Sequence, residues 1–217
     1  MQLASDHVQF ERRIDGASNA KATLVLAHGA GAPMESPFMN QVADGLAQRH
    51  WRVVRFNFPY MVRSVQSGKK TAPDRLPTLI SAFEAEVRAA AADGMPLWIG
   101  GKSMGGRIAS LILDQVATEA GVQGGICLGY PFHPPGQPDK LRTEHLQTLK
   151  TPCLILQGER DSFGKRGEVE GYGLAKSIQV SWVSAGDHSF KPTKSSGLSW
   201  EDNLSFVLEQ IDQFAGS

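Results

Sequence analysis

The stretch IGGKSMGG at residues 99–106 constrains this chain more than any other feature, because it fits two incompatible local structures. Gly101-Lys102-Ser103 matches the end of a phosphate-binding loop, in which a glycine turn precedes a lysine and a hydroxyl. The five residues from Gly101 to Gly105 also match G-x-S-x-G, a sharp turn between a strand and a helix with the serine at its apex. The flanking sequence decides between the two.

The phosphate-binding alternative fails on residue type and on local structure. The motif G-x-x-x-x-G-K-[ST] requires its first glycine at the position that Pro96 occupies here. Proline has a fixed φ and no N–H to donate to a phosphate. The intervening residues 97–100, Leu-Trp-Ile-Gly, are typical of a buried strand and not of a wrapping loop.

The strand–turn–helix alternative fits on the same two counts. PLWIG (96–100) is typical of a strand, and MGGRIASLILDQVATEAG (104–121) has helical apolar periodicity and a terminal glycine. A serine at so sharp a turn has a strained backbone, so the residues two positions away must lack bulky side chains. Gly101 and Gly105 meet this need, and the pattern predicts that Ser103 is a nucleophile.

Apolar runs alternate with amphipathic stretches along the rest of the chain. We expect strands at 22–28, 51–58, 96–100, 122–130, 151–158 and 178–183, and helices at 36–50, within 73–94 after Pro77, at 104–121 and, weakly, at 165–176. A capping box at 199–202 opens a last helix whose core face is Trp200, Leu204, Val207, Leu208, Ile211 and Phe214. This alternation predicts a doubly wound, mainly parallel α/β sheet. No linker divides residues 1–217, so we expect a single domain.

Two stretches interrupt the alternation, and we expect both to be long loops. They cover residues 59–75 and 131–146, and each leaves the carboxyl end of a strand, where open α/β sheets bind ligands. Their length favours a functional role. The candidate substrate-binding residues from these loops are Tyr60, Met61, Arg63, Phe132 and His133. For Arg63 a solvated side chain is favoured over a partner for a substrate carboxylate.

A serine nucleophile needs a base and an acid that orients the base. In the strand–turn–helix arrangement these follow the serine in the order acid, then histidine. Asp161 ends the strand-like run LILQGERD, with Glu159 as the fallback, and His188 follows the run SWVSAG. Asp187 is a rival acid that is better placed to shape the turn. His133 is a rival base, but it precedes the acid.

The last part expected is an oxyanion hole made of two backbone N–H groups. One belongs to Met104, the residue after the serine. The other should come from the small-residue loop after the first long strand, where we favour Ala30 over Gly31. We expect His28, which begins that loop, to stabilise the turn.

Composition bounds the remaining alternatives. Lys+Arg and Asp+Glu both number 22, so the chain has no electrostatic reason to bind nucleic acid or an acidic membrane. No apolar run approaches the roughly 20 residues that span a bilayer, and residues 1–15 carry charges where a secretory signal needs an apolar stretch.

Cys127 and Cys153 lie in strand-like runs and should be buried thiols, and we expect a cytoplasmic protein. The histidines at 7, 28, 50 and 145 show no metal-ligand spacing.

With these residues in hand, the chain resembles the α/β-hydrolase superfamily over nearly its whole length. The matching motifs are LAHGAGA, GGKSMGG, LQGERD and GDHSF, and the likeness is strongest to a compact, dienelactone-hydrolase-like branch. RFNFPYM, the PDR of 73–75 and GYPFHPPGQPDKLR resemble the group that includes the testis-expressed hydrolase-like proteins and an NSL-complex subunit. The resemblance implies a Ser–Asp–His triad and hydrolysis without a cofactor or metal. No insertion large enough for a cap domain is visible.

The sequence therefore predicts a serine hydrolase that cleaves an ester, thioester or related acyl bond of a small molecule. Ser103, His188 and Asp161 are the expected nucleophile, base and orienting acid. The alternative is a scaffold or binding protein that keeps the hydrolase fold without turnover. The complete set of three residues argues against this alternative, because a scaffold has no physical need for it. The oligomeric state and the identity of the acyl group do not follow from the sequence.

Overall fold

The computed structural model describes residues 12–216. Residues 1–11, which carry most of the argument against a secretory signal, lie outside the described residues. The strands are β1 (Arg12–Asp15), β2 (Ala22–Ala27), β3 (Trp51–Phe56), β4 (Leu97–Lys102), β5 (Val122–Leu128), β6 (Cys153–Gly158) and β7 (Ile178–Val183). Within residues 12–216 they form one sheet in the order β1-β3-β2-β4-β5-β6-β7, in which only β1 runs antiparallel to its neighbour. The predicted doubly wound, mainly parallel sheet is confirmed.

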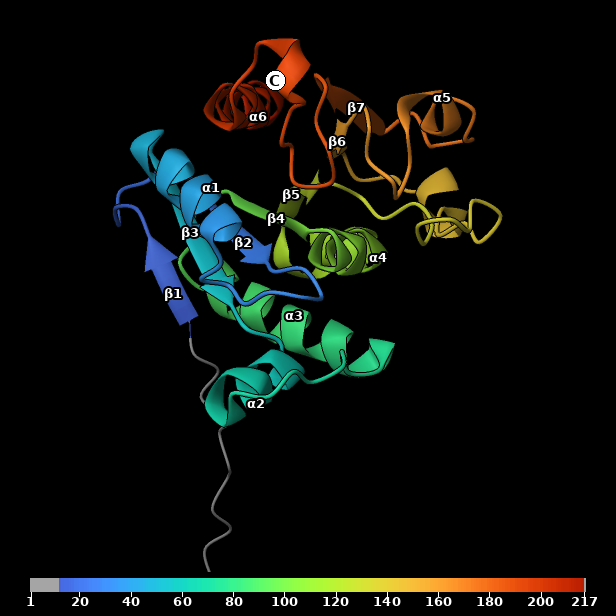
Figure 1. Cartoon of the computed structure of the whole chain (residues 1–217). Coiled ribbons are helices and arrows are strands. Elements are labelled where there is room, and N and C mark those ends of the chain that lie inside the picture. The colour runs from blue at the N-terminus through green and yellow to red at the C-terminus, as the bar shows by residue number, and fades with distance from the viewer. Residues whose placement is uncertain (1–11, 217) are drawn as a thin grey trace, which may run out of the picture.

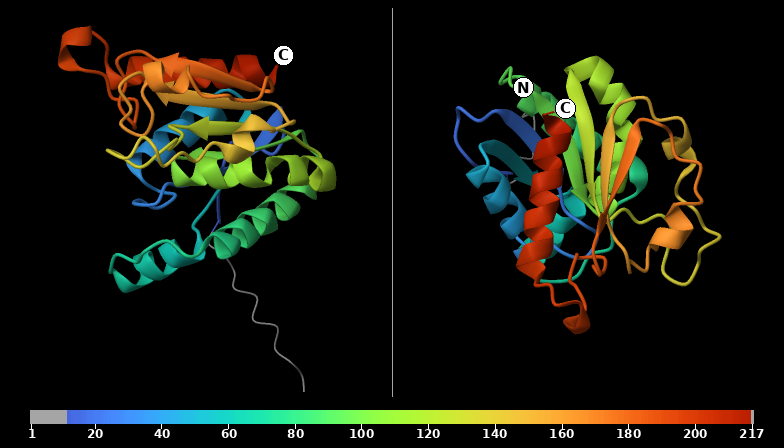
Figure 2. Two further views of the ribbon diagram at one scale, coloured as in Figure 1. Left: turned by 90° about the vertical axis from the view of Figure 1, so that its right-hand side faces the viewer. Right: turned by 90° about the horizontal axis from the view of Figure 1, so that it is seen from above.

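Helices cover both faces of this sheet (Figures 1 and 2). Helices α1 (Pro37–Gln48) and α6 (Trp200–Ala215) pack on one face, and α3 (Leu76–Ala91) and α4 (Met104–Ala120) pack on the other. Helix α2 (Pro59–Ser67) lies beside α3, and α5 (Arg166–Val169) is a single turn after β6. Two 3₁₀ turns, Glu144–Gln147 and Lys194–Ser196, lie in the connections. No large cap domain is present among the residues described.

The two apolar layers follow from the period of two along each strand. On β2, Leu24 and Leu26 point into the layer under α1 and α6, whereas Val25 and Ala27 point into the layer under α3 and α4. All six residues of β2 are buried, as expected for a strand covered on both sides. The core thus holds β2, β4, β5 and β6 rigidly beneath the loops at their carboxyl ends.

The last helix begins where the capping box predicted. The Ser199 hydroxyl accepts from the Asp202 N–H, and the Asp202 carboxylate accepts from the Ser199 N–H, so two free amides of the first turn are satisfied. Four of the six predicted core residues, Leu204, Val207, Leu208 and Ile211, are buried. Trp200 and Phe214 are half-buried and pack against the same apolar layer.

The prediction that residues 59–75 form a loop is wrong for their first half. Residues 59–67 form α2, with Pro59 in the first turn and Gly68 ending the helix in a left-handed conformation at φ 66°. Proline at the start and glycine after the end are ordinary helix signals. The apolar face of α2 is short, with Tyr60 and Met61 buried, so its periodicity is hard to detect.

Two other elements differ from the sequence expectation. The helix expected over 165–176 is limited to Arg166–Val169. Strand β1 was not predicted, because its sequence RRID has no apolar alternation. It is joined to β3 by the buried Arg55, whose guanidinium donates two hydrogen bonds to the Asp15 carboxylate. A bidentate ion pair therefore adds to the strand pairing where apolar packing is weak.

The expected burial of Cys127 and Cys153 is confirmed. Both are free thiols on neighbouring strands of the core, and their sulfurs are 4.0 Å apart. None of the described helices is both long and apolar enough to cross a membrane.

Candidate active site

Ser103 lies at a sharp turn between β4 and α4, with φ 52° and ψ −114°. This conformation is strained for a residue with a side chain, and strain of this kind concentrates at functional sites. The turn closes only because its glycines have no Cβ. A Cβ on Gly101 would lie 2.5 Å from the Gly105 carbonyl carbon, and one on Gly105 would lie 2.5 Å from the Ala27 carbonyl oxygen. The pattern G-x-S-x-G is therefore a packing requirement at this turn.

The imidazole of His188 lies between Ser103 and Asp161. Its Nε2 is 2.9 Å from the Ser103 hydroxyl, and its Nδ1 is 2.7 Å from Oδ2 of Asp161. A carboxylate accepts and cannot donate, so in the neutral imidazole Nδ1 carries the proton and the Nε2 lone pair faces the serine O–H. This tautomer is the one that can take the serine proton.

Asp161 is fully buried in the turn after β6, and its oxygens are held by hydrogen bonds. Besides His188, the Gln157 side-chain amide donates to Oδ2 at 3.0 Å, and the Phe163 N–H donates to Oδ1 at 2.9 Å. These bonds offset the cost of burying the carboxylate and fix its orientation toward His188. Phe163 also stacks its ring on the imidazole at a centroid distance of 4.2 Å.

The rival residues are engaged elsewhere. The Asp187 carboxylate accepts from the Ser189 and Lys191 N–H groups, so it shapes the turn that carries His188. Glu159 accepts from the Ala185 N–H and from Arg166. The His133 ring contacts Glu168 and the Pro134 carbonyl.

The loop after β2 lies over Ser103. His28 is buried and ties this loop to the next one: its Nδ1 is 2.6 Å from the Gly29 carbonyl oxygen, and its Nε2 accepts from the Phe58 N–H. Burial lowers the pKa of His28 to about 4, so the ring is neutral and supports both bonds. Ala30 and Gly31 border the same cavity as Ser103. Met104 opens α4, where the first amides have no intrahelical acceptor.

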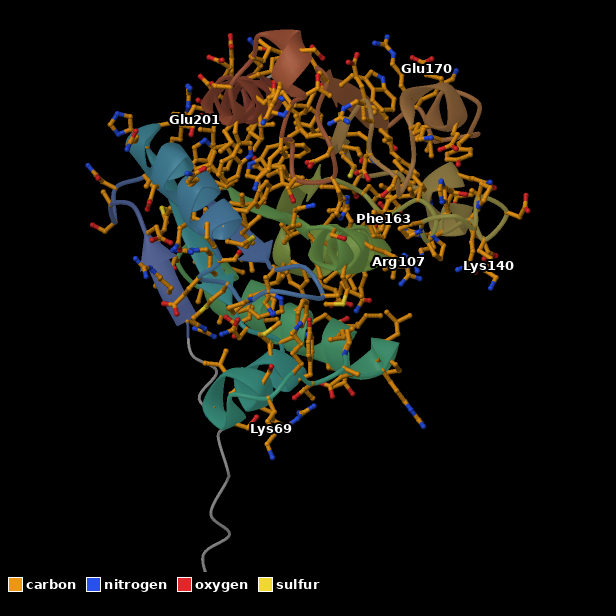
Figure 3. The ribbon with its side chains drawn as sticks, viewed as in Figure 1. Lys69, Arg107, Lys140, Phe163, Glu170 and Glu201 are labelled. Atoms are coloured by element: carbon orange, nitrogen blue, oxygen red, sulfur yellow. The ribbon has the colours of Figure 1, made fainter. Side chains whose placement is uncertain are left out.

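A cavity of about 470 Å³ opens above Ser103. Its walls are the Gly29–Ala32 loop, the start of α1, the turn that carries His188, a ring from the loop after β6 and a ring from the start of α6. The lining side chains beyond the Gly29–Ala32 loop are Ser36, Pro37, Phe38, Met39, Lys102, Ser103, Phe163, His188, Ser189, Lys191 and Trp200. Phe163 is labelled in the interior of Figure 3, while Lys69 and Lys140 lie at the outer edges of that view.

The five residues predicted to bind substrate do not line this cavity. Tyr60 is buried, and its hydroxyl donates to the Ala30 carbonyl. Met61 borders a separate cavity beyond the Ala30–Gly31 loop, and Arg63 pairs with Asp74 at 2.5 Å. Phe132 and His133 are buried behind the chain that follows β6. Helix α2 and the core hold side chains that were expected to project from loops, so a contact between these five residues and substrate stays a prediction.

The walls come instead from segments that sequence reasoning did not single out. Phe38 and Met39 belong to the first turn of α1, which was predicted only as a helix. Gln157, which holds Asp161, is the polar exception in the apolar strand CLILQG, and that exception was a usable signal. Lys102 was considered only as a phosphate ligand. Among the residues described, no group of three or more potential ligands is arranged to hold a metal ion.

Comparison with known proteins gives the family. A sequence profile described as alpha/beta hydrolase domain matches residues 20–216, which is most of the chain. The chain belongs to the alpha/beta hydrolase domain family. The triad-like geometry at Ser103 therefore lies in a family whose fold places a serine at this turn.

Solved structures of this fold superpose on the α/β hydrolase over most of its length. An alpha-beta serine hydrolase homologue from Coxiella burnetii matches with a TM-score of 0.69 and 18% identity, covering 93% of this chain and 91% of that one. A serine hydrolase without a lid from Xanthomonas campestris gives 0.65 and 17%, covering 94% and 89%. Dienelactone hydrolase from Anabaena variabilis gives 0.66 and 17%, covering 99% and 94%. At these identities the likeness establishes the fold.

Proposed function

We propose that this protein is a serine hydrolase that cleaves an ester, thioester or related acyl bond through an acyl-enzyme. The observation that carries the proposal is the continuous hydrogen-bonded chain from Asp161 through His188 to Ser103. The strained serine at the head of α4 and the cavity directly above it support the same chemistry.

In the proposed reaction, His188 Nε2 takes the Ser103 proton as Oγ attacks the acyl carbon. Asp161 holds the imidazole and stabilises the imidazolium that forms. Backbone N–H groups of Met104 and of Ala30 or Gly31 are the candidate donors to the developing oxyanion. His188 then protonates the leaving alcohol or thiol. Water attacks the acyl-enzyme, with the same imidazole as base, and Ser103 is released.

The cavity suits a short or medium acyl group. A volume of about 470 Å³ is within the usual range for small-molecule sites, and the walls are mostly apolar and aromatic. A long lipid chain would extend beyond the walls into solvent. We further propose a cytoplasmic location and kinship with the testis-expressed hydrolase-like group, the latter resting on RFNFPYM and GYPFHPPGQPDKLR.

The rival proposal is a scaffold that keeps the fold without turnover. A scaffold has no need for an imidazole hydrogen-bonded to a strained serine, so the geometry favours the enzyme.

A panel of p-nitrophenyl esters from acetate to decanoate tests the enzymatic proposal. We expect the highest kcat/KM at short or medium chain length. Phe38→Ala should shift the optimum toward longer chains, because Phe38 closes one wall of the cavity. Arg63→Ala is the matched control, since Arg63 pairs with Asp74 outside the cavity. Absence of turnover on every ester by folded protein would favour the scaffold.

A further inference from the structure

The residue just before Ser103 reaches across the site to the residue that bears the imidazole. Lys102 donates from Nζ to the main-chain carbonyl oxygen of His188 at 2.5 Å. Its side chain is only 8% exposed, and it borders the cavity that holds Ser103. Two neighbouring residues of one turn therefore bind His188 at two points, Ser103 at the ring and Lys102 at the backbone.

The ammonium of Lys102 is held in a tight niche. A Cβ placed on Gly129 would lie 2.9 Å from Lys102 Nζ and 3.3 Å from His188 Nδ1, so both nitrogens border the position that a side chain would take there. The centre of the Phe38 ring lies 5.4 Å from Nζ. The acceptor is a neutral carbonyl, and no ion pair joins Lys102 to a carboxylate within residues 12–216.

Burial of this kind is costly for an ammonium. It lowers the pKa of Lys102 to about 8, although the negative charges of Asp161 and Asp187 act in the opposite direction. A methionine would fill a similar shape without the desolvation cost. Packing alone thus gives no reason for a lysine here, and a role for the donor and its charge is needed.

We propose that Lys102 is a positioning residue for His188. Its hydrogen bond holds the turn that carries His188 against the turn that carries Ser103, and its charge lies close to the imidazole. The proposal rests on the proposed hydrolase function. The hydrogen bond from Lys102 to the His188 carbonyl fixes the position of the His188 backbone. From this position the imidazole can bind Asp161 and Ser103 at the same time. A loose histidine turn would lengthen the Nε2–Oγ contact, and a misplacement of about 1 Å costs on the order of 10²-fold in rate.

The positive charge of Lys102 should also act electrostatically on the His188 ring. The charged side chains around Lys102 and His188 are Asp161 after β6, Asp187 from the turn that carries His188, and Lys191 on the wall of the same cavity. Both carboxylates favour an imidazolium, whereas the ammonium disfavours it. Removing the Lys102 charge should therefore favour the imidazolium, which cannot take the serine proton.

The experiment compares wild type with Lys102→Met, Lys102→Arg and the control Lys140→Met, which removes a charge from an exposed loop far from the site. The readouts are kcat and KM on the best p-nitrophenyl ester and the pH profile of kcat/KM. We expect Lys102→Met to lower kcat by roughly 10- to 100-fold with little change in KM. The acid limb of the kcat/KM profile of this variant should move to higher pH, because the Lys102 charge that disfavours the imidazolium has been removed. Lys102→Arg should retain the wild-type acid limb, and Lys140→Met should match wild type in every respect.

A wild-type kcat and an unmoved acid limb in folded Lys102→Met would overturn the proposal. If that variant does not fold, Lys102→Gln decides in its place: it keeps an N–H donor without the charge, so a shifted acid limb supports the proposal and an unshifted one overturns it. Failure of the proposed function is distinguishable, because wild type itself would then neither turn over esters nor react with a fluorophosphonate at Ser103.

Discussion

The phenolic hydroxyl of Tyr60 donates to the carbonyl oxygen of Ala30 at 3.0 Å. Tyr60 is fully buried, and burial raises its pKa, so the hydroxyl stays a donor at all working pH values. The bond anchors the loop that carries the candidate oxyanion donors Ala30 and Gly31. A residue predicted to touch substrate thus supports the loop over Ser103 from behind.

Tyr60→Phe should therefore lower kcat and leave KM nearly unchanged. The phenyl ring keeps the packing, but the Ala30 carbonyl loses its donor and the loop gains freedom. We expect a loss of roughly tenfold, less than removal of an oxyanion donor itself. Steady-state kinetics on a short ester measure this, with Tyr172→Phe, on a half-exposed tyrosine away from the cavity, as the control. Equal kinetics for all three proteins would contradict the role.

Asp161→Asn should cost on the order of 10⁴-fold in kcat, because an amide in place of the carboxylate favours the wrong imidazole tautomer. Asp187→Asn should cost far less, since its carboxylate binds backbone amides of the turn. Single-turnover rates on one ester compare the two variants directly. The reverse ranking would move the orienting acid to Asp187.

The charged lining of the cavity predicts a substrate preference. Its charged or titratable side chains are Lys102, His188 and Lys191, and no Asp or Glu is among the described lining residues. Lys191 is exposed at the wall, with Nζ 5.2 Å from the centre of the Trp200 ring. We expect an ester with a terminal carboxylate to be preferred over a neutral ester of similar length.

Lys191→Met should reduce that preference by about three- to fivefold, which is the scale of an exposed ion pair. The measurement is the ratio of kcat/KM for p-nitrophenyl hemiglutarate to that for p-nitrophenyl valerate, at low and high salt. Lys194→Met is the matched control, because Lys194 is an exposed neighbour outside the cavity. An unchanged ratio in Lys191→Met would show that this cation does not contact the acyl group.

His28 predicts an acid sensitivity of the fold. Its pKa falls to about 4 in the folded protein, against about 6.5 in an unfolded chain. Above pH 6.5 the ring is neutral in both states. Between pH 6.5 and 4 only the unfolded state binds the proton, so the free energy of unfolding falls, by up to about 3 kcal/mol at pH 4.

Urea unfolding at pH 7.5 and pH 5 measures this slope. His28→Gln should be less stable than wild type at pH 7.5, because it loses the geometry of the bonds to Gly29 and Phe58. Its stability should nevertheless depend less on pH. A His28→Gln slope equal to that of wild type would show that another group carries the acid sensitivity.

The sequence was most informative where one residue type satisfies one strict requirement. Gly101 and Gly105 admit no Cβ, so the serine turn could be predicted. Fully buried parallel strands such as β2 and β6 have continuous apolar runs, so their order along the chain could also be predicted. The candidates Ser103, Asp161 and His188 were then chosen because they follow β4, β6 and β7 in turn.

The walls of the cavity could not be predicted in the same way. Whether Phe38 faces Ser103 depends on how α1 packs on the sheet. The local sequence pattern shows only which face of the helix is apolar. Phe132 and Tyr60 are aromatic residues near strand ends, as a binding residue would be, yet both are buried. The contact between Lys102 and His188 joins residues far apart in the chain, and no spacing rule signals it.

The central claim is that Ser103 is a nucleophile that forms an acyl-enzyme. Its most direct test is intact-protein mass spectrometry after reaction with a small fluorophosphonate or a slow p-nitrophenyl ester, followed by peptide mapping, on wild type and Ser103→Ala. We predict one adduct on wild type that maps to Ser103, none on folded Ser103→Ala, and a loss of ester turnover on the order of 10⁴-fold or more in that variant. Unchanged turnover by folded Ser103→Ala, or an adduct on another residue, would contradict the account.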